Sequence, residues 1–439
     1  MTEIPEHLPG EPLHTPPGPA KKLLSTLQSV VLVSLVATLT TPLWPFYLVA
    51  AAIWGWAPNV PRLRQIARYL RLTWTANPPK PGLSLYTRVV LTLAIARKVA
   101  VVPLWGLAWW LDELLYGSAL RGVQVRSPLL EISAARSGST QLARYLEDDP
   151  HLVAPNLLQL FFPYRWLWHL APHTLGRLIT PEKVRHKLAE AMPPEFIQRH
   201  EGDPFRTDTF EAVLYLAHLN HLAALLGPEM IVSDIGFAEL GPHNQCLWEE
   251  DFIALADGLA RKCLLDAGLA PDGRPRRFFI KGHFLAAADA LARKYPDAIF
   301  LTMIREPAPR LQSAVNFMRA NPMAGGATIP WVWLGQAFSA SEAAYCEIEQ
   351  AWFTRPEGPR RCVLRFTDYV RDLEGALSRV YRECLDQETL PDYAPREHPP
   401  RERVNYLLNR SLAQVGVDEA ALNARLTDYI AWCRGEVAQ

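Results

Sequence analysis

The sequence predicts an α/β fold in which a P-loop-like parallel sheet is flanked by helices and follows an N-terminal membrane-associated helical segment. Three observations lead to this prediction. Short apolar runs alternate with helical stretches after residue 123, a turn of small residues joins the first run to a helix, and residues 23–57 carry no charge. Strands that alternate with helices are typical of a parallel sheet covered on both faces.

The N-terminal part divides into a polar and an apolar segment. Residues 1–22 hold many prolines and little apolar periodicity, which predicts a disordered tail. Residues 23–57 exceed the ~20 residues that one membrane crossing needs. Pro42 and Pro45 lie near the middle, so a kinked transmembrane span and a re-entrant helical hairpin both fit. Basic residues on both flanks favour the hairpin, and a buried core hairpin of a soluble protein is the alternative.

Residues 58–120 are expected to form amphipathic helices on the membrane surface and a linker. Their apolar stretch, 89–111, contains Arg97 and Lys98, which make a full crossing costly. A helix on the membrane surface and a helix packed on the main domain both fit. The flank that follows residues 23–57 is the more basic one, which predicts a cytoplasmic location for the main domain, residues 121–439.

The main domain supplies the elements of the sheet. The candidate strands are Leu129–Ser133, Met230–Ser233, Arg277–Ile280, Ile299–Met303 and Cys362–Phe366. Helices are expected between them, including Thr209–Leu226, Asp251–Ala267 and Leu285–Lys294. Ligands of such sheets bind outside the carboxyl ends of the strands. Residues that directly follow a strand are therefore the candidates for a functional site.

Composition narrows the choice of partners. The formal net charge is +0 and the isoelectric point is 7.2, so no basic face for nucleic acid is indicated. The hydrophobic content of 49% with 14 tryptophans fits membrane contact. The six cysteines form no CxxC pair and no zinc-ligand spacing. They are expected to be buried, reduced thiols, as in a cytoplasmic domain.

The most informative motif lies in residues 128–142. An apolar strand is followed by Arg136-Ser137-Gly138-Ser139-Thr140, where a helix begins. The first N–H groups of a helix and its dipole attract anions, and the hydroxyl and guanidinium groups add donors. The motif therefore predicts a phosphate-binding cradle. It lacks the Gly-Lys-Ser/Thr ending of a Walker A loop, which argues against ordinary ATP chemistry.

Two further pairs follow strands. Lys281 and His283 come directly after one strand, where a lysine can neutralise a leaving group and a histidine can accept a proton. Arg305 ends the next strand, and Ser313 lies on the helix behind it. Arginine suits bidentate contact with phosphate, although a salt bridge to Glu306 explains Arg305 equally well.

Together these motifs resemble the sulfotransferase superfamily, whose members use 3′-phosphoadenosine 5′-phosphosulfate (PAPS), and in particular a bacterial membrane-associated branch. In that family a basic residue followed by Ser-Gly-Thr-Thr holds the 5′-phosphosulfate, and residues 136–140 match it. An arginine and a serine eight residues later bind the 3′-phosphate, as Arg305 and Ser313 would. The family's Lys-Thr-His segment matches Lys281-Gly282-His283, and Phe366 matches an aromatic residue that stacks on adenine.

Three features depart from the family pattern. The proline usual before the basic residue of the cradle is Ala135, and Glu131 replaces an apolar residue of the strand. Some relatives carry a catalytic glutamate after the first helix, where this chain has Asn156 and Gln159. An amide cannot act as a base, so His283 has to fill that role.

The resemblance implies a PAPS-dependent sulfotransferase that needs no metal. It moves a sulfuryl group to a hydroxyl or amine by in-line attack, with His283 as base and with Lys281 and Arg136 stabilising the developing charge. The acceptor is not readable from the sequence. Membrane association makes a lipid or glycolipid hydroxyl a candidate, and the oligomeric state stays open. The alternatives are a non-catalytic sulfotransferase-like membrane scaffold and a P-loop nucleotide kinase.

Overall fold

The computed structural model describes most of the chain. It covers residues 4–11, 18–75, 84–174, 180–191, 194–200, 202–210, 242–320, 330–399 and 406–436. The strand expected at 230–233 and most of the helix expected at 209–226 lie outside the described residues. Thr209 and Phe210 are described and are not helical, because Thr209 instead forms a parallel bridge with Lys281.

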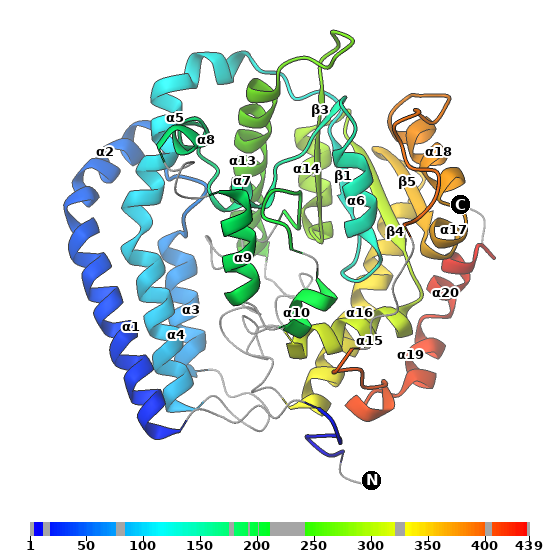
Figure 1. Cartoon of the computed structure of the whole chain (residues 1–439), viewed down its shortest axis with the longest axis horizontal. Coiled ribbons are helices and arrows are strands. Elements are labelled where there is room, and N and C mark those ends of the chain that lie inside the picture. Colours follow the sequence, from blue (N-terminus) through cyan, green and yellow to red (C-terminus); the bar gives the residue numbers. More distant parts are fainter. Residues whose placement is uncertain are drawn as a thin grey trace.

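The described part of the domain is built on a parallel sheet of five strands, as predicted (Figure 1). The strands are β1 (Leu129–Ile132), β2 (Leu152–Val153), β3 (Arg277–Gly282), β4 (Ile299–Ile304) and β5 (Arg360–Arg365), in the order β2-β3-β1-β4-β5. Every residue of β1 and β4 is buried, which explains their nearly continuous apolar sequences. The sequence did not predict β2, because two residues carry no periodicity.

Helices cover both faces of this sheet. One face packs on α13 (Pro242–Ala267), α14 (Ala288–Lys294), α15 (Pro307–Ala320) and α16 (Trp331–Thr354), and the other on α6 (Ser139–Glu147), α17 (Phe366–Arg371) and α18 (Leu373–Cys384). Successive strand residues enter opposite layers: Leu130 belongs to the first core and Leu129 to the second. The two short helices α19 (Glu419–Arg425) and α20 (Thr427–Arg434) pack on the first side. The five cysteines whose side chains are described (Cys263, Cys346, Cys362, Cys384 and Cys433) are buried and form no disulfide, as expected of reduced thiols.

The apolar N-terminal segments form a layer of helices beside the domain (Figure 1). They are α1 (Pro19–Thr40), α2 (Trp44–Trp54), α3 (Leu63–Thr75), α4 (Leu85–Ala100) and α5 (Val102–Gly122). The 3-10 turn η1 (Thr41–Leu43), which contains Pro42, joins α1 to α2 without a loop, so the segment is kinked. Two stretches, Pro19–Trp54 and Leu85–Gly122, are long and apolar enough to cross a membrane, with 6% and 33% of their most apolar windows buried.

The first residues depart from the disordered tail expected from their prolines. Within 4–11, the carboxylate of Glu11 lies 2.7 Å from Nε of Arg410, and Glu6 forms an ion pair with Arg319. The carbonyl of Pro5 also accepts a hydrogen bond from Arg410. Helix α1 already begins at Pro19, so the expected boundary at residue 22 falls inside a helix.

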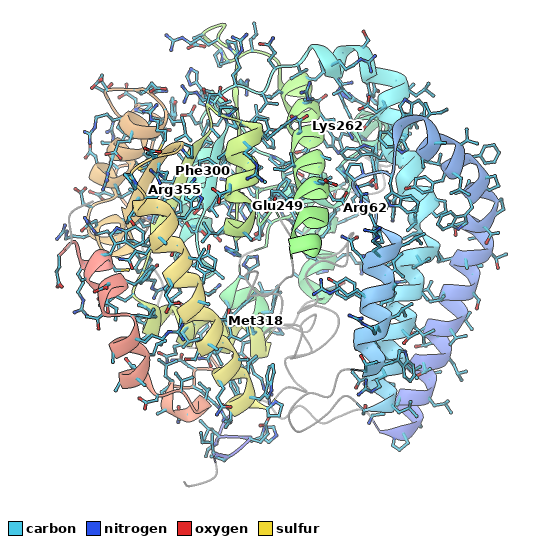
Figure 2. All side chains as sticks on the ribbon, turned by 180° about the vertical axis from the view of Figure 1, so that it is seen from behind. Arg62, Glu249, Lys262, Phe300, Met318 and Arg355 are labelled. Carbon is cyan, nitrogen blue, oxygen red and sulfur yellow. The ribbon has the colours of Figure 1, made fainter. Side chains whose placement is uncertain are left out.

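Two ion pairs connect the N-terminal helices to α13. Nζ of Lys262 lies 3.0 Å from the carboxylate of Asp112 on α5, and both side chains are buried. The ammonium group also lies 3.4 Å from the ring centre of Trp109. Arg62, at the start of α3, contacts Asp251 at 2.6 Å. Figure 2 labels both cations, Lys262 on α13 and Arg62 between α13 and α3. Part of residues 58–120 is therefore packed on the main domain.

Replacing Lys262 with methionine should destabilise the fold, because Asp112 then stays buried without its cation. Breaking a buried ion pair costs about 3–5 kcal/mol. In the variant, Asp112 still accepts hydrogen bonds from the backbone N–H groups of Arg165 and Trp166, which partly compensate its charge. We therefore expect the free energy of unfolding in urea to fall by about 3 kcal/mol, the lower end of this range. The control Arg425→Met removes an exposed pair with Glu347 and should cost less than about 1 kcal/mol. Equal losses in the two variants would contradict the assignment.

Candidate active site

The predicted site residues meet at the carboxyl edge of the sheet. β1 lies between β3 and β4, with Glu131 opposite Lys281 on one side and opposite Leu301 on the other. The loop after β1, the Lys281–His283 segment at the carboxyl end of β3 and Arg305 directly after β4 therefore lie next to one another at this edge. The parallel register brings together three motifs that lie far apart in the sequence.

The cradle after β1 has the backbone of an anion-binding turn. Gly138 has a φ of 101° and Arg136 a φ of 69°, and α6 begins at Ser139. A Cβ on Gly138 would lie 2.9 Å from the Phe366 ring and 3.1 Å from Sδ of Met303, so only glycine fits. The hydroxyl of Ser137 is buried and has no hydrogen-bond partner among the described residues. An oriented turn with an unused buried donor suits an anionic ligand.

The two parts of the predicted donor site are directly linked. Nε of Arg136 donates to Oγ of Ser313 over 3.0 Å, and Nη1 of Arg305 donates to the carbonyl of Arg136 over 2.8 Å. Burial, together with the positive charges of Arg199 and Arg305, lowers the pKa of Arg136 to about 10. The repulsion between these guanidinium groups makes the edge of the sheet strongly attractive to anions.

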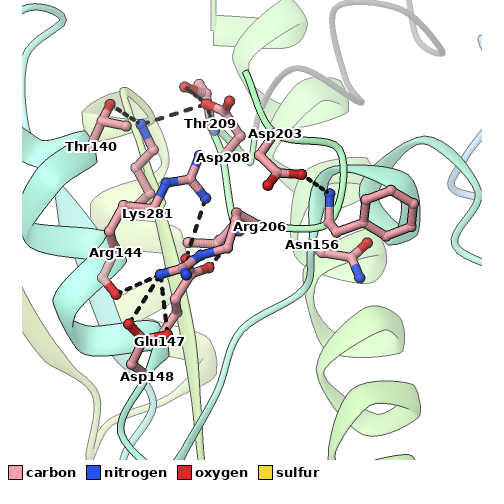
Figure 3. A network of polar contacts seen from close by, with 12 residues as sticks. Thr140, Arg144, Glu147, Asp148, Asn156, Asp203, Arg206, Asp208, Thr209 and Lys281 are labelled. Carbon is pink, nitrogen blue, oxygen red and sulfur yellow. Dashed lines mark hydrogen bonds and ion pairs between the residues drawn. The ribbon is translucent and has the colours of Figure 1, made fainter. Parts of the chain in front are cut away.

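Lys281 is held in the same place by a hydroxyl and a carboxylate. Its Nζ donates to Oγ1 of Thr140 over 3.0 Å and lies 3.7 Å from Oδ1 of Asp208 (Figure 3). Asp208 also accepts from the backbone N–H of Thr209 at 2.6 Å, and its Oδ2 lies 3.2 Å from Nε2 of His200. Although burial opposes it, the contacts with His200 and Lys281 hold the pKa of Asp208 well below its usual range. Lys281 and Asp208 thus form a buried ion pair beside the cradle.

Asp208 is a site residue that the sequence did not reveal. It lies on a segment, 203–210, that has no strand pattern and reaches the sheet by single contacts. The N–H of Phe210 donates to the carbonyl of Lys281 over 2.9 Å, and the N–H of Thr207 donates to Glu147 on α6. Arg206 adds ion pairs to Glu147 and Asp148 (Figure 3). These contacts join distant segments, so no local spacing could have shown them.

His283 is positioned by the cradle loop. Its Nδ1 lies 2.7 Å from the carbonyl of Ser133. A carbonyl can only accept a hydrogen bond, so Nδ1 carries the proton and Nε2 carries the lone pair. Burial, followed by the charge of Lys281, lowers the pKa of His283 to about 3. The imidazole is therefore neutral at ordinary pH and able to accept a proton.

A cavity of about 200 Å³ opens beside Arg305. It is lined by Ile304, Arg305, Glu306, Pro309, Phe366, Thr367 and Cys433. The guanidinium of Arg305 lies 4.3 Å from the ring centre of Phe366 and covers one face of that ring. Glu306, which the sequence offered as an ion-pair partner of Arg305, contacts Arg434 at 2.9 Å. An aromatic ring and an arginine thus border a space at the ends of β4 and β5.

The residues that depart from the family pattern have structural roles. Glu131 is fully buried and accepts a hydrogen bond from the hydroxyl of Ser133, whose oxygen in turn accepts from the N–H of Met303 at 2.8 Å. Ser133 is therefore a hydrogen-bond partner of this buried carboxylate. Asn156 and Gln159 form a reciprocal capping box at the start of α7 (Leu157–Phe161). Their amides complete a helix terminus.

Acid should destabilise the protein in part through His283. The unfolded side chain titrates near 6.5 and the folded one at about 3, so between these values protons bind preferentially to the unfolded chain. This contribution to stability is fully present above pH 6.5 and is lost as the pH falls toward 3. We expect the urea midpoint of His283→Gln to fall less between pH 7 and pH 4 than that of the wild type. Parallel pH profiles would show that His283 is not held neutral.

Comparisons with known proteins agree with the fold. The chain matches no curated protein sequence, whereas the model of the sulfotransferase family matches residues 128–386. The sulfotransferase STF9 from Mycobacterium avium has a TM-score of 0.60 and 16% identity, and the match covers 88% of this chain and 95% of that one. STF1 from Mycobacterium tuberculosis H37Rv has a TM-score of 0.52 and 16% identity, over 87% and 97%. These structures share the fold, and because the family model covers more than half of the sequence, the chain belongs to the sulfotransferase family.

Proposed function

We propose that the protein transfers a sulfuryl group from PAPS to a hydroxyl or amine of an acceptor. The observation that carries this proposal is the hydrogen bond from Arg136 to Ser313. It joins the predicted 5′-phosphosulfate site to the predicted 3′-phosphate site, as a donor with two anionic ends requires. Lys281 and His283 lie at the same edge of the sheet and supply the groups for transfer.

The residues of the site suit a donor with two anionic groups. The unused hydroxyl of Ser137 and the left-handed turn at Arg136 and Gly138 suit the approach of an anionic group to the backbone. Residues 136–140 would hold the 5′-phosphosulfate, and Arg305 and Ser313 the 3′-phosphate. Phe366, at the wall of the adjoining cavity, would stack on adenine. Since Arg305 covers one face of that ring, it would have to turn toward the 3′-phosphate for adenine to use that face.

Each side chain of the site has its own role in the proposed reaction. Nε2 of His283 takes the proton of the acceptor as its oxygen or nitrogen attacks sulfur in line with the leaving group. Lys281 and Arg136 stabilise the negative charge that builds on the leaving phosphate and on the sulfuryl oxygens. Thr140 and Asp208 position Lys281 for this role. The proposal assigns charge stabilisation to these cations and uses no metal.

The N-terminal helices support a membrane location for this reaction. Apolar side chains on α1 project away from the fold, among them Leu27, Val31 and Leu35, which are 53%, 65% and 56% exposed. They recur every four residues and so lie along one side of the helix. We assign residues 23–57 to the membrane, with the catalytic domain on the cytoplasmic side. A lipid or glycolipid hydroxyl is then an accessible acceptor.

Replacing Arg305 with methionine should weaken donor binding. The variant loses the charged contact to the 3′-phosphate, so we expect the Kd for adenosine 3′,5′-bisphosphate to rise by about 10–100-fold in calorimetry. Binding of adenosine 5′-phosphate should change much less. The control is Arg425→Met, an exposed arginine on α19, which should bind both nucleotides like the wild type.

The same experiment separates the alternatives. Unchanged bisphosphate binding by Arg305→Met would refute the 3′-phosphate assignment. His283→Gln should bind the donor normally and lose about 10²–10⁴-fold in kcat. Donor binding by the wild type without turnover on any hydroxylated lipid or glycan would favour the membrane scaffold. Dependence of an activity on Mg²⁺ and ATP would favour the nucleotide kinase.

Three glutamates on the exposed side of α1 should release the protein from membranes. Each charge at the centre of a membrane helix costs about 2.5–3.5 kcal/mol. We expect the variant with Leu27, Val31 and Leu35 replaced by glutamate to move from the carbonate-washed membrane fraction to the soluble fraction. The control carries glutamate at Leu269 and Leu407, which are also exposed but lie outside the N-terminal helices. A wild-type protein that is soluble without detergent would refute the membrane assignment.

A further inference from the structure

A third arginine lies beside the cradle and has no role in the assignments above. The short helix α10 (Pro194–Arg199) ends at this point, and the carbonyl of Arg199 accepts a hydrogen bond from Nη1 of Arg136 over 3.0 Å. The side chain of Arg199 is only 3% exposed. Its guanidinium lies 4.2 Å from the ring centre of Tyr406. Arg199 is thus a buried cation directly at the predicted donor site.

Two nitrogens of this guanidinium have no hydrogen-bond acceptor within the described part of the chain. Nε and Nη2 are buried and have no hydrogen-bond partner there. Glu195, the nearest carboxylate, lies 3.9 Å from Nη2 and is hydrogen-bonded to the N–H of Leu408. Arg410 shows the contrast, because its equally buried guanidinium contacts Glu11 and two backbone carbonyls. Burying a charged group whose N–H donors lack acceptors costs free energy, unless a bound ligand supplies those acceptors.

The charges around Arg199 indicate which kind of ligand it would bind. Its charge and that of Arg305 both act on Arg136, and burial lowers the pKa of Arg199 itself. Arg136 packs over the ring of Phe317 at 5.1 Å, and Phe317 packs on Phe196 of α10, so the two arginines share one wall. A multiply charged oxyanion bound between buried guanidinium groups would offset their mutual repulsion.

We propose that Arg199 binds, together with Arg136, a phosphate or sulfate group of a substrate. The inference rests on the proposed function, in which two sources supply such a group. One is the donor, through its 3′-phosphate or its 5′-phosphosulfate. The other is an acceptor that itself carries a phosphate or sulfate group.

The variant Arg199→Met tests this assignment first without ligand. The ion pair of Arg199 with Glu195 is long and two of its donors are buried without acceptors among the described residues, so its removal should leave the melting temperature at or above the wild-type value. Arg410→Met, which removes a fully paired arginine of similar burial, should lower it. A loss of stability in Arg199→Met as large as that in Arg410→Met would overturn the proposal, since it would show a structural role.

Ligand titrations then identify the source of the anion. Arg199→Met should bind adenosine 3′,5′-bisphosphate about 10–100-fold more weakly than the wild type, and Arg199→Lys should recover part of the loss. A loss confined to the bisphosphate assigns the 3′-phosphate, and an equal loss for adenosine 5′-phosphate assigns the other end of the donor. If inorganic sulfate still raises the melting temperature of the wild type saturated with bisphosphate, and not that of Arg199→Met, the anion belongs to the acceptor.

Two outcomes separate this inference from the proposed function. Normal bisphosphate binding by both proteins, with no difference in their response to sulfate, would overturn the role of Arg199 and leave the donor assignment intact. Failure of the wild type to bind bisphosphate, with stabilisation by sulfate that depends on Arg199, would refute the donor assignment and support the anion site.

Discussion

The position of β1 between two parallel neighbours is the constraint on which the site depends. β1 pairs with β3 and β4 in one register, so three chain segments leave the sheet at the same edge. The cradle, the Lys281–His283 segment and Arg305 therefore meet although about 150 to 170 residues separate β1 from the other two. Every residue of β1 and β4 is buried, so both strands lie between the two helical layers.

Buried cations in this protein fall into two groups. Arg310 is surrounded by Glu342, Glu349 and the hydroxyl of Tyr429, and these contacts connect α15, α16 and α20. Such an arginine is part of the core. At the edge of the sheet, the positive charges of Arg199 and Arg305 both act on Arg136. The fold tolerates this repulsion because stability is gained in the core, which leaves the site with the charge that an anionic donor requires.

The catalytic domain and the N-terminal helices are mechanically connected. The buried pair between Asp112 and Lys262 joins α5 to α13, and α13 packs on β3, the strand that carries Lys281. Arg62 adds a second contact from α3 to the same helix. The orientation of the apolar N-terminal surface relative to the site is therefore fixed by α13. An acceptor held at that surface would meet the site in a defined direction.

The sequence by itself determined the α/β class, four of the five strands and the side chains of the cradle, because periodicity and glycine spacing are local properties. Local information also placed Lys281, His283, Arg305 and Ser313 at strand ends and on the following helix. Only the tertiary structure decided that residues 4–11 pack on the domain, that Asp208 neutralises Lys281 and that Ser133 pairs with Glu131. It also brought Arg199 to the cradle. These contacts join segments without periodicity, and their partners are chosen by packing across the molecule, which no spacing along the chain records.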